Sequence, residues 1–222
     1  MRAMFGRVAH RYDFANHLLS FGIDRLWRRR VVKLVRPVLR REGARVLDLC
    51  CGTGDLMIAL GRDRGRAVMG SDFCHPMLQA ASLKDPSAQL LEADGLRLPL
   101  ADGSLDLLTV AFGFRNFANY EAGLLELRRV LRPGGMLAIL EFSRPTNKAI
   151  RTLYEWYSGR VLPRVGGMVS GSRDAYEYLP SSVRKFPEAE ELAAMMERAG
   201  FAAVRFERLT FGVVAIHLGD IT

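Results

Sequence analysis

Short apolar runs that end at glycine or acidic residues alternate with amphipathic stretches along most of this chain. The run that begins at Val46 and the run Ser104–Ala111 are apolar enough to be central strands of a parallel sheet. Amphipathic helices are expected near Tyr120–Leu131 and over Glu188–Ala199. Further strands are expected over Arg66–Asp72, Ala88–Ala93, Met136–Phe142, Phe201–Glu207 and Phe211–Leu218. Strands that alternate with helices predict an α/β fold with a mostly parallel sheet and helices on both of its faces.

The first strand breaks into a glycine-rich turn, Gly52-Thr53-Gly54, that opens a helix, which is typical of a nucleotide-type cofactor site. A dinucleotide-binding loop needs a third glycine three residues after the second, and Met57 stands there, which disfavours NAD. The loop also lacks the Lys that a P-loop requires. Asp48 instead closes the strand four residues before Gly52, so the loop suits a ligand with a cationic, amino-acid-bearing end. S-adenosylmethionine, with its ammonium and sulfonium groups, is such a ligand.

Acidic residues after the next two strands extend this prediction. Asp72 ends the second strand 20 residues after Gly52, where a carboxylate reaches the ribose hydroxyls of a bound nucleotide. Asp94-Gly95 follows the third strand, where the carboxylate is expected to accept from the adenine amino group. With the Arg132-Pro133-Gly134-Gly135 turn before the fifth strand, this order resembles the Rossmann-like class I methyltransferases. The expected contacts to S-adenosylmethionine are Asp48, Gly52, Thr53, Gly54, Asp72, Asp94, Gly95 and Ala111.

Several motifs lie outside this cofactor core and extend over nearly the whole chain. They are Tyr12-Asp13-Phe14-Ala15-Asn16, Leu19–Asp24, Trp27-Arg28-Arg29, Ala111–Phe117, Leu140–Pro145, Tyr176–Leu179, Phe186-Pro187 and Gly212–Gly219. Together they resemble the ubiquinone/menaquinone C-methyltransferase family. The resemblance implies C-methylation of a polyprenyl quinol and an antiparallel hairpin of the last two strands at the sheet edge. It leaves open demethylmenaquinol and the benzoquinol precursor of ubiquinone, and the absence of an N-terminal extension favours demethylmenaquinol.

Arg115 and Asn116, together with Tyr12, are the candidate catalytic residues for such a reaction. An aromatic carbon attacks a methyl sulfonium when electron density is pushed onto the ring, as it is in a phenolate. Arg115 follows the fourth strand at the carboxyl edge of the sheet, where ligands bind, and its charge is expected to lower the pKa of a substrate hydroxyl. Asn116 is expected to orient the ring oxygen. The alternative is an Arg-Asn pair that only caps the following helix.

Tyr12 and Asn16 share one face of a helix and are expected to line the substrate, whereas a helix cap by Asp13 is the competing interpretation. The general base is not identified, because none of the histidines stands in a recognisable relay. His217 follows an apolar run and is expected to be a packed strand residue. Water activated by Arg115 and Asn116 is a further option, since well-aligned methyl transfer needs little beyond proximity.

The length of 222 residues favours a single methyltransferase domain over residues 1–222. Its expected parts include an N-terminal helical segment at residues 1–42 and a lid inserted at about residues 143–187, because so long a connection usually has a function. The chain has no apolar run of about 18 residues and no secretory h-region, so a cytoplasmic location is expected. Three cysteines, two of them adjacent, fit neither a disulfide framework nor a metal site, and no metal is expected.

The net charge of +8 permits a nucleic-acid partner or an anionic membrane surface. Basic residues cluster from Arg25 to Arg41 in one expected helix, which forms either a solvated face or a surface that docks on lipid headgroups at the inner face of the membrane. A nucleic-acid methyltransferase is disfavoured, because no Asn/Asp-Pro-Pro-aromatic or Pro-Cys motif follows the fourth strand. A non-catalytic regulator would lack the substrate motifs. The sequence does not indicate the oligomeric state.

Overall fold

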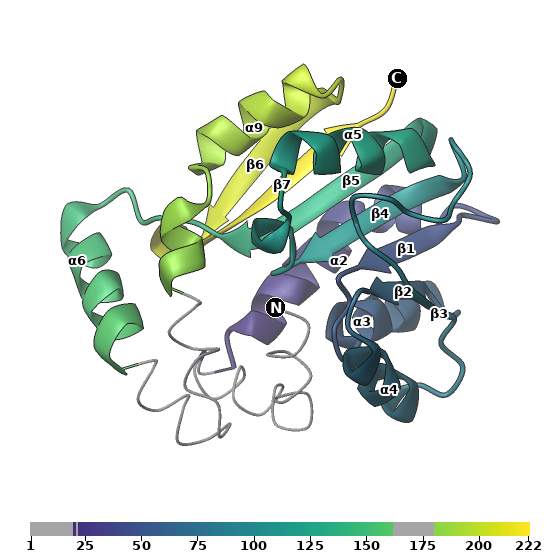
Figure 1. Cartoon of the computed structure of the whole chain (residues 1–222), viewed down its shortest axis with the longest axis horizontal. Helices are drawn as coiled ribbons and strands as arrows, with labels where there is room; N and C mark the ends of the chain where they lie inside the picture. Colours follow the sequence, from purple (N-terminus) through teal and green to yellow (C-terminus); the bar gives the residue numbers. More distant parts are fainter. Residues whose placement is uncertain (1–19, 21, 162–179) are drawn as a thin grey trace.

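The computed structural model describes residues 20, 22–161 and 180–222. Its centre is a seven-stranded sheet in the order β3-β2-β1-β4-β5-β7-β6 (Figure 1). β1 to β5 are parallel to one another, and β7 runs antiparallel to β5 and β6. The mostly parallel sheet and its antiparallel terminal hairpin are therefore confirmed. The strand bounds are β1 Val46–Leu49, β2 Met69–Asp72, β3 Leu90–Glu92, β4 Leu105–Ala111, β5 Leu131–Phe142, β6 Ala202–Leu209 and β7 Val214–Asp220.

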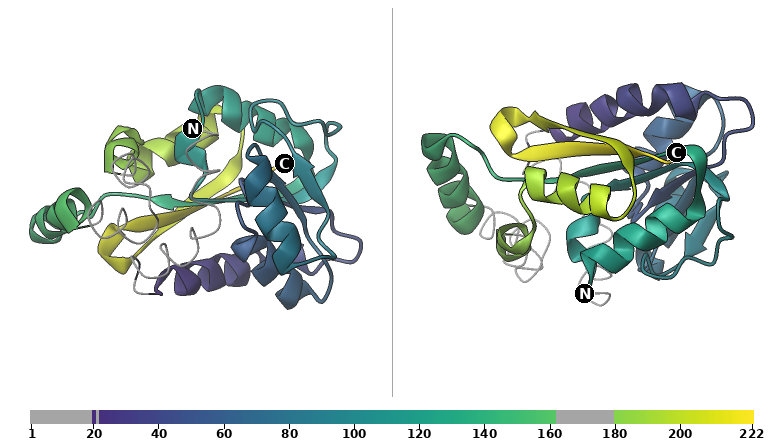
Figure 2. Two further views of the ribbon diagram at one scale, coloured as in Figure 1. Left: turned by 60° about the horizontal axis from the view of Figure 1, so that its bottom comes forward. Right: turned by 90° about the horizontal axis from the view of Figure 1, so that it is seen from above.

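Helices cover both faces of the sheet, as Figure 2 shows in its view from above. One face is covered by α2 (Asp24–Leu39) and α3 (Asp55–Arg64), and the other by α5 (Tyr120–Val130) and α9 (Ala189–Arg198). α4 (His75–Lys84) lies against β2 and β3. Every helix among the described residues is too short or too polar to cross a bilayer.

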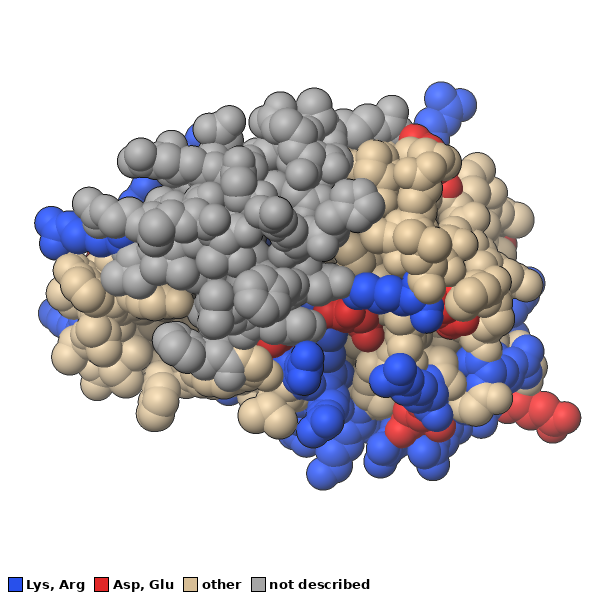
Figure 3. Space-filling view, turned by 90° about the horizontal axis from the view of Figure 1, so that it is seen from below, with Lys and Arg blue, Asp and Glu red and all other residues tan. Residues whose placement is uncertain are grey.

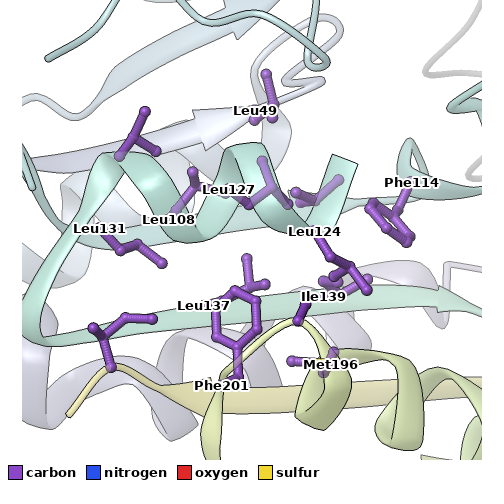
Figure 4. Packing of buried hydrophobic residues seen from close by; sticks show 14 of the residues in the cluster. Leu49, Leu108, Phe114, Leu124, Leu127, Leu131, Leu137, Ile139, Met196 and Phe201 are labelled. Atoms are coloured by element: carbon purple, nitrogen blue, oxygen red, sulfur yellow. The ribbon is translucent and has the colours of Figure 1, made fainter. Parts of the chain in front are cut away.

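The two cores follow from the alternation of side chains along the strands. In β5, Leu137 and Ile139 face α5 and α9, whereas Ala138 and Leu140 face α2 and α3. The first core is drawn in Figure 4, where Leu124 of α5 and its neighbours meet the sheet. Burial of each of these leucines contributes about 1.5–3 kcal/mol to the stability of the fold. The two packed layers therefore hold the strands rigidly, and with them the sheet edge at which the loops gather.

Two turns differ in the structure from those expected from the sequence. β5 begins at Leu131, so it includes the Pro-Gly-Gly residues that were expected to form a separate turn, and its pairing shifts register beside Leu105 and Leu107. At the hairpin, a short 3-10 helix (Thr210–Gly212) precedes β7, which begins at Val214 and not at the expected Phe211. The reason is that Thr210, Phe211 and Gly212 all have left-handed φ angles, of 50°, 58° and 92°, which a strand does not accept.

The segment expected to form a lid is only partly described. It contributes α6 (Lys148–Trp156), one π-helical turn (Tyr157–Val161) and a short helix over residues 180–185. Residues 162–179, which include Tyr176 and Tyr178, lie outside the described residues. α6 begins at an Asn147 cap, whose side chain accepts from the amide of Ala149 at 2.9 Å.

Candidate active site

The glycine-rich loop between β1 and α3 is fixed by left-handed backbone and by close contact with β2. Gly52 and Gly54 have φ angles of 55° and 90°, and α3 begins directly after Gly54. The amide of Cys51 donates to the carbonyl of Ser71 at 2.9 Å. A Cβ at Gly70 would lie 3.0 Å from Cys51 Sγ, so a glycine in β2 is what allows the loop to lie this close.

Asp48 lies under this loop and is almost fully buried, with 1% of its surface exposed. It pairs with Thr109 across β1 and β4, and Thr109 Oγ1 donates to its Oδ1 at 2.6 Å. Burial raises the pKa of Asp48 to about 7, although the hydrogen bond from Thr109 and the charge of Arg28 lower it. Asp48 is therefore harder to ionise than an ordinary aspartate, and a cation bound beside it would favour its charged form.

Asp72 joins two loops at the end of β2. Its Oδ2 accepts from the amide of Gly52, and its Oδ1 accepts from the amide of Cys74, both at 2.9 Å. Burial raises its pKa, and these backbone hydrogen bonds lower it. Because each carboxylate oxygen can accept two hydrogen bonds, the side chain retains acceptor capacity for ribose hydroxyls.

Asp94 and Gly95 form an exposed turn after β3. Asp94 Oδ1 accepts from the amide of Leu96 at 2.9 Å, which fixes the turn. A Cβ at Gly95 would lie 2.4 Å from Phe117 Cζ, and one at Gly123 would lie 2.5 Å from Phe117 Cδ2. Phe117 thus packs between this loop and α5. This packing role was not expected from the sequence, where Phe117 belongs only to the Ala111–Phe117 motif.

Backbone strain occurs at the carboxyl ends of the two central strands. Phe112, which follows Ala111 at the end of β4, has a φ angle of 57°, and Cys50 after β1 has one of 55°. A non-glycine residue in this region costs about 1–3 kcal/mol and persists where its surroundings hold it. Gly113 packs directly against Cys50, because a Cβ at position 113 would lie only 2.3 Å from Cys50 Cβ. The two edge loops therefore hold each other in place.

Arg115 lies in a short 3-10 helix (Phe114–Asn116) after β4 and is buried. Its Nη1 donates to Glu141 Oε1 at 3.0 Å and also to the carbonyl of Phe112, and its amide donates to Glu141 Oε2 at 3.2 Å. The guanidinium carbon lies 5.4 Å from the centre of the Phe142 ring. The Nε of Arg115 is buried and has no hydrogen-bond partner among the described residues. Asn116, another of the three catalytic candidates, is half-buried beside it.

Two groups near Arg115 were not expected from the sequence to have a role. Glu141 is 1% exposed and belongs to β5, the strand next to β4. Tyr154 comes from α6, where burial raises its pKa to about 12 while the charge of Arg115 lowers it. Glu141 lies in the quoted Leu140–Pro145 motif, and its acidic side chain in an apolar strand was the available signal.

His217 is a packed strand residue, as expected. It is 2% exposed, its Nε2 donates to the carbonyl of Ala189 at 2.8 Å, and its ring stacks on Phe206. Burial lowers its pKa to about 4, so it is neutral at physiological pH. Tyr12, with Asp13 and Asn16, lies outside the described residues. The described residues contain no group of three or more His, Cys, Asp or Glu side chains that could hold a metal ion.

The basic helix α2 divides its charges between the interior and the solvent. Several arginines of α2 form ion pairs: Arg28 with Asp24 and Asp55, Arg30 with Glu207, and Arg36 with Asp63. Arg40, the C-cap residue of the helix, also pairs with Asp63. Arg25, Arg29 and Lys33 are exposed along one face, beside the exposed Leu26. Trp27 is buried and donates from Nε1 to Thr210 Oγ1 at 2.8 Å.

Comparison with known proteins identifies the family of this chain. A demethylmenaquinone methyltransferase of Thermus thermophilus is 53% identical over 222 residues, which cover 98% of this chain and 99% of that protein. A ubiquinone/menaquinone biosynthesis C-methyltransferase of Syntrophotalea carbinolica is 45% identical, with 98% of this chain and 92% of that protein covered. The crystal structure of a SAM-dependent methyltransferase from Thermotoga maritima, described as a possible histamine N-methyltransferase, has a TM-score of 0.71 at 19% identity and covers 100% of both chains, which shows the shared fold. Residues 1–220 match the model of the ubiE/COQ5 methyltransferase family, and the chain belongs to that family.

Proposed function

We propose that this enzyme methylates a ring carbon of demethylmenaquinol, with S-adenosylmethionine as the methyl donor, in menaquinone biosynthesis. The proposal is supported by family membership and by relatives of 53% and 46% identity that are named demethylmenaquinone methyltransferases. The observation that carries it is the buried Arg115, placed at the carboxyl end of β4 next to the loop of β1. One of its donors, Nε, has no partner among the described residues.

The loops after β1, β2 and β3 fit S-adenosylmethionine. Asp48 places a carboxylate under the glycine-rich loop, and Asp72 and Asp94 follow at the next two strands. These acids suit a ligand that carries a cationic end, ribose hydroxyls and an adenine amino group. When bound, S-adenosylmethionine supplies an electrophilic methyl group on its sulfonium.

Arg115 would stabilise the oxygen of the quinol as it becomes a phenolate, which raises the electron density at the neighbouring ring carbon. Glu141 and the carbonyl of Phe112 fix the guanidinium through Nη1, so its remaining donors, Nε among them, do not need to reorganise. Asn116 would orient the ring oxygen, and Tyr12 would line the substrate. The hydroxyl proton of the quinol, and then the proton on the methylated ring carbon, would leave to water.

The test is methyl transfer by the purified chain with labelled S-adenosylmethionine. Three acceptors are offered separately: demethylmenaquinol, the 2-methoxy-6-polyprenyl-benzoquinol precursor of ubiquinone, and total RNA. We expect label in the naphthoquinol. Label only in the benzoquinol would move the assignment to ubiquinone synthesis, which the double name of the Syntrophotalea carbinolica relative allows. Label in RNA, or in none of the three, would overturn the proposal.

We also propose that the exposed face of α2 contacts an anionic membrane that holds the substrate. The face consists of Arg25, Arg29 and Lys33 with the exposed Leu26, and Figure 3 shows basic side chains gathered in the lower part of its view from below. Each cation near an anionic surface contributes about 1 kcal/mol.

Flotation with vesicles rich in anionic lipid tests this contact. The protein should float at low salt and be released as salt rises. The triple variant Arg25→Gln, Arg29→Gln and Lys33→Gln should abolish flotation. Gln at Arg62, Arg66 and Arg97, which are exposed elsewhere, removes the same charge and should have little effect. Equal loss in both variants would indicate only a net-charge effect.

A further inference from the structure

Arg28 differs from the other basic residues of α2 because it faces the glycine-rich loop. Its side chain is only 14% exposed, against 47% for Arg36 two turns later. It forms an ion pair with Asp24 one turn earlier, and its Nη2 lies 3.6 Å from Asp55 Oδ2. Its guanidinium carbon also lies 6.0 Å from the centre of the Phe112 ring. Arg28 therefore lies between α3 and the carboxyl end of β4.

The groups around Arg28 bracket the loop expected to hold the amino-acid end of S-adenosylmethionine. Asp55 is the first residue of α3, directly after Gly54. Asp48 is the last residue but one of β1, the strand before the loop, and the charge of Arg28 lowers its pKa against the effect of burial. Phe112 follows β4, which pairs with β1. A cation and a buried carboxylate are thus placed at one small region of the sheet edge.

The methionine end of S-adenosylmethionine carries both an ammonium and a carboxylate. Asp48 supplies an anion for the first, and the carboxylate requires a cation. A guanidinium offers five N–H donors in a planar fork that matches a carboxylate. Asp24 and Asp55 hold this fork at Nη1 and Nη2, which pre-organises it. Because the proposed function requires this ligand, we propose that Arg28 binds the methionine carboxylate of S-adenosylmethionine.

Lys84 is another cation at this loop, but its contacts give it a different role. Its Nζ lies 3.0 Å from Thr53 Oγ1 and 2.9 Å from Asp55 Oδ1, and 33% of its side chain is exposed. It braces the loop from α4. Arg28 is less exposed and lies beside Phe112, at the strand end where ligands bind in open α/β sheets. The geometry therefore favours Arg28 for the carboxylate.

The experiment compares two ligands by calorimetry on the whole chain: S-adenosylmethionine and its decarboxylated form, which lacks only the carboxylate. The unsubstituted protein should prefer the carboxylated ligand by about tenfold or more, as expected for a charge-assisted hydrogen-bonded pair. Arg28→Met should lose most of this preference while binding the decarboxylated ligand within about threefold of the unsubstituted protein. Arg28→Lys should retain part of it.

Arg36→Met is the matched control, because it also breaks an ion pair between α2 and α3 but does so away from the loop. It should keep the full preference. If Arg28→Met weakens both ligands equally, or if the unsubstituted protein binds both equally well, the assignment is overturned. The second comparison needs no variant, so it can overturn the assignment even if Arg28→Met fails to fold, and Arg28→Lys then tests the residue itself. Failure of the proposed function is distinct, since the chain would then bind neither ligand or would methylate a different acceptor.

Discussion

The two halves of the proposed active site are held by different forces. On the cofactor side, which comprises the loops after β1, β2 and β3, the important contacts are backbone amides that donate to Asp72 and glycines packed against neighbouring atoms. On the substrate side, which comprises Arg115, Glu141 and Tyr154, one buried ion pair fixes the site. The cofactor side is therefore determined by backbone shape, whereas the substrate side depends on two charges in the interior. Substitutions should affect the two sides differently.

The largest effect is expected on stability from Glu141→Ala. Removing one partner of a buried pair leaves an uncompensated charge and costs about 3–5 kcal/mol. Urea unfolding should show this loss. The double variant Glu141→Ala with Arg115→Met should recover most of it, because no buried charge is left unpaired. A single variant that loses less than about 1 kcal/mol would show that water reaches the pair, and the contrast between the two sides would then disappear.

Arg115→Ala should lower methyl transfer by on the order of 100-fold or more, since one pre-organised donor to a developing oxyanion has this value. Affinity for S-adenosylmethionine should stay within a few-fold, because the contacts of Arg115 lie on the substrate side. Arg115→Lys should rescue only in part. Higher pH should relieve part of the loss as the quinol ionises unaided. Single-turnover rates and calorimetry separate the two quantities, and a parallel loss of both would make Arg115 a structural residue.

Asp72→Ala should weaken S-adenosylmethionine binding by at least about tenfold while the fold persists. The structure gives two reasons for the loss: the carboxylate that would bind the ribose is removed, and the amides of Gly52 and Cys74 lose their acceptor. Asp94→Ala is the comparison, because Asp94 is exposed and its side chain accepts from the amide of Leu96 within its own turn. It should have the smaller effect. Unchanged affinity in folded Asp72→Ala would remove Asp72 from the site.

The cofactor side could be predicted from the sequence because its signals are local. A strand, an acid and a glycine turn lie within about ten consecutive residues, and a parallel sheet brings such loops to one edge. Glu141 and Arg115 are 26 residues apart, and their contact depends on the pairing of β4 with β5. Phe117 and Gly95 likewise meet only in the folded chain. The basic run was taken as one surface, but the helical period turned Arg28 inward and left Arg25 exposed.

The smallest expected effect is a pH dependence that originates in Asp48. Its pKa of about 7 in the folded protein is above the ordinary value near 3.8. The folded state therefore holds this proton more tightly than the unfolded state does. The contribution of Asp48 to stability is full below about pH 4 and is lost as pH rises toward 7.

A bound cation favours the ionised carboxylate, so S-adenosylmethionine affinity should rise several-fold between pH 6 and pH 8 and binding should release protons. Calorimetry in phosphate and in Tris detects the protons, because the two buffers differ in ionisation enthalpy. Asp48→Asn should abolish the part of the pH dependence and of the proton release that comes from Asp48. The amino group of the ligand also titrates, but it affects both proteins alike. The same pH dependence in both would show that Asp48 stays in one protonation state, and that its carboxylate serves only to join β1 to Thr109 of β4.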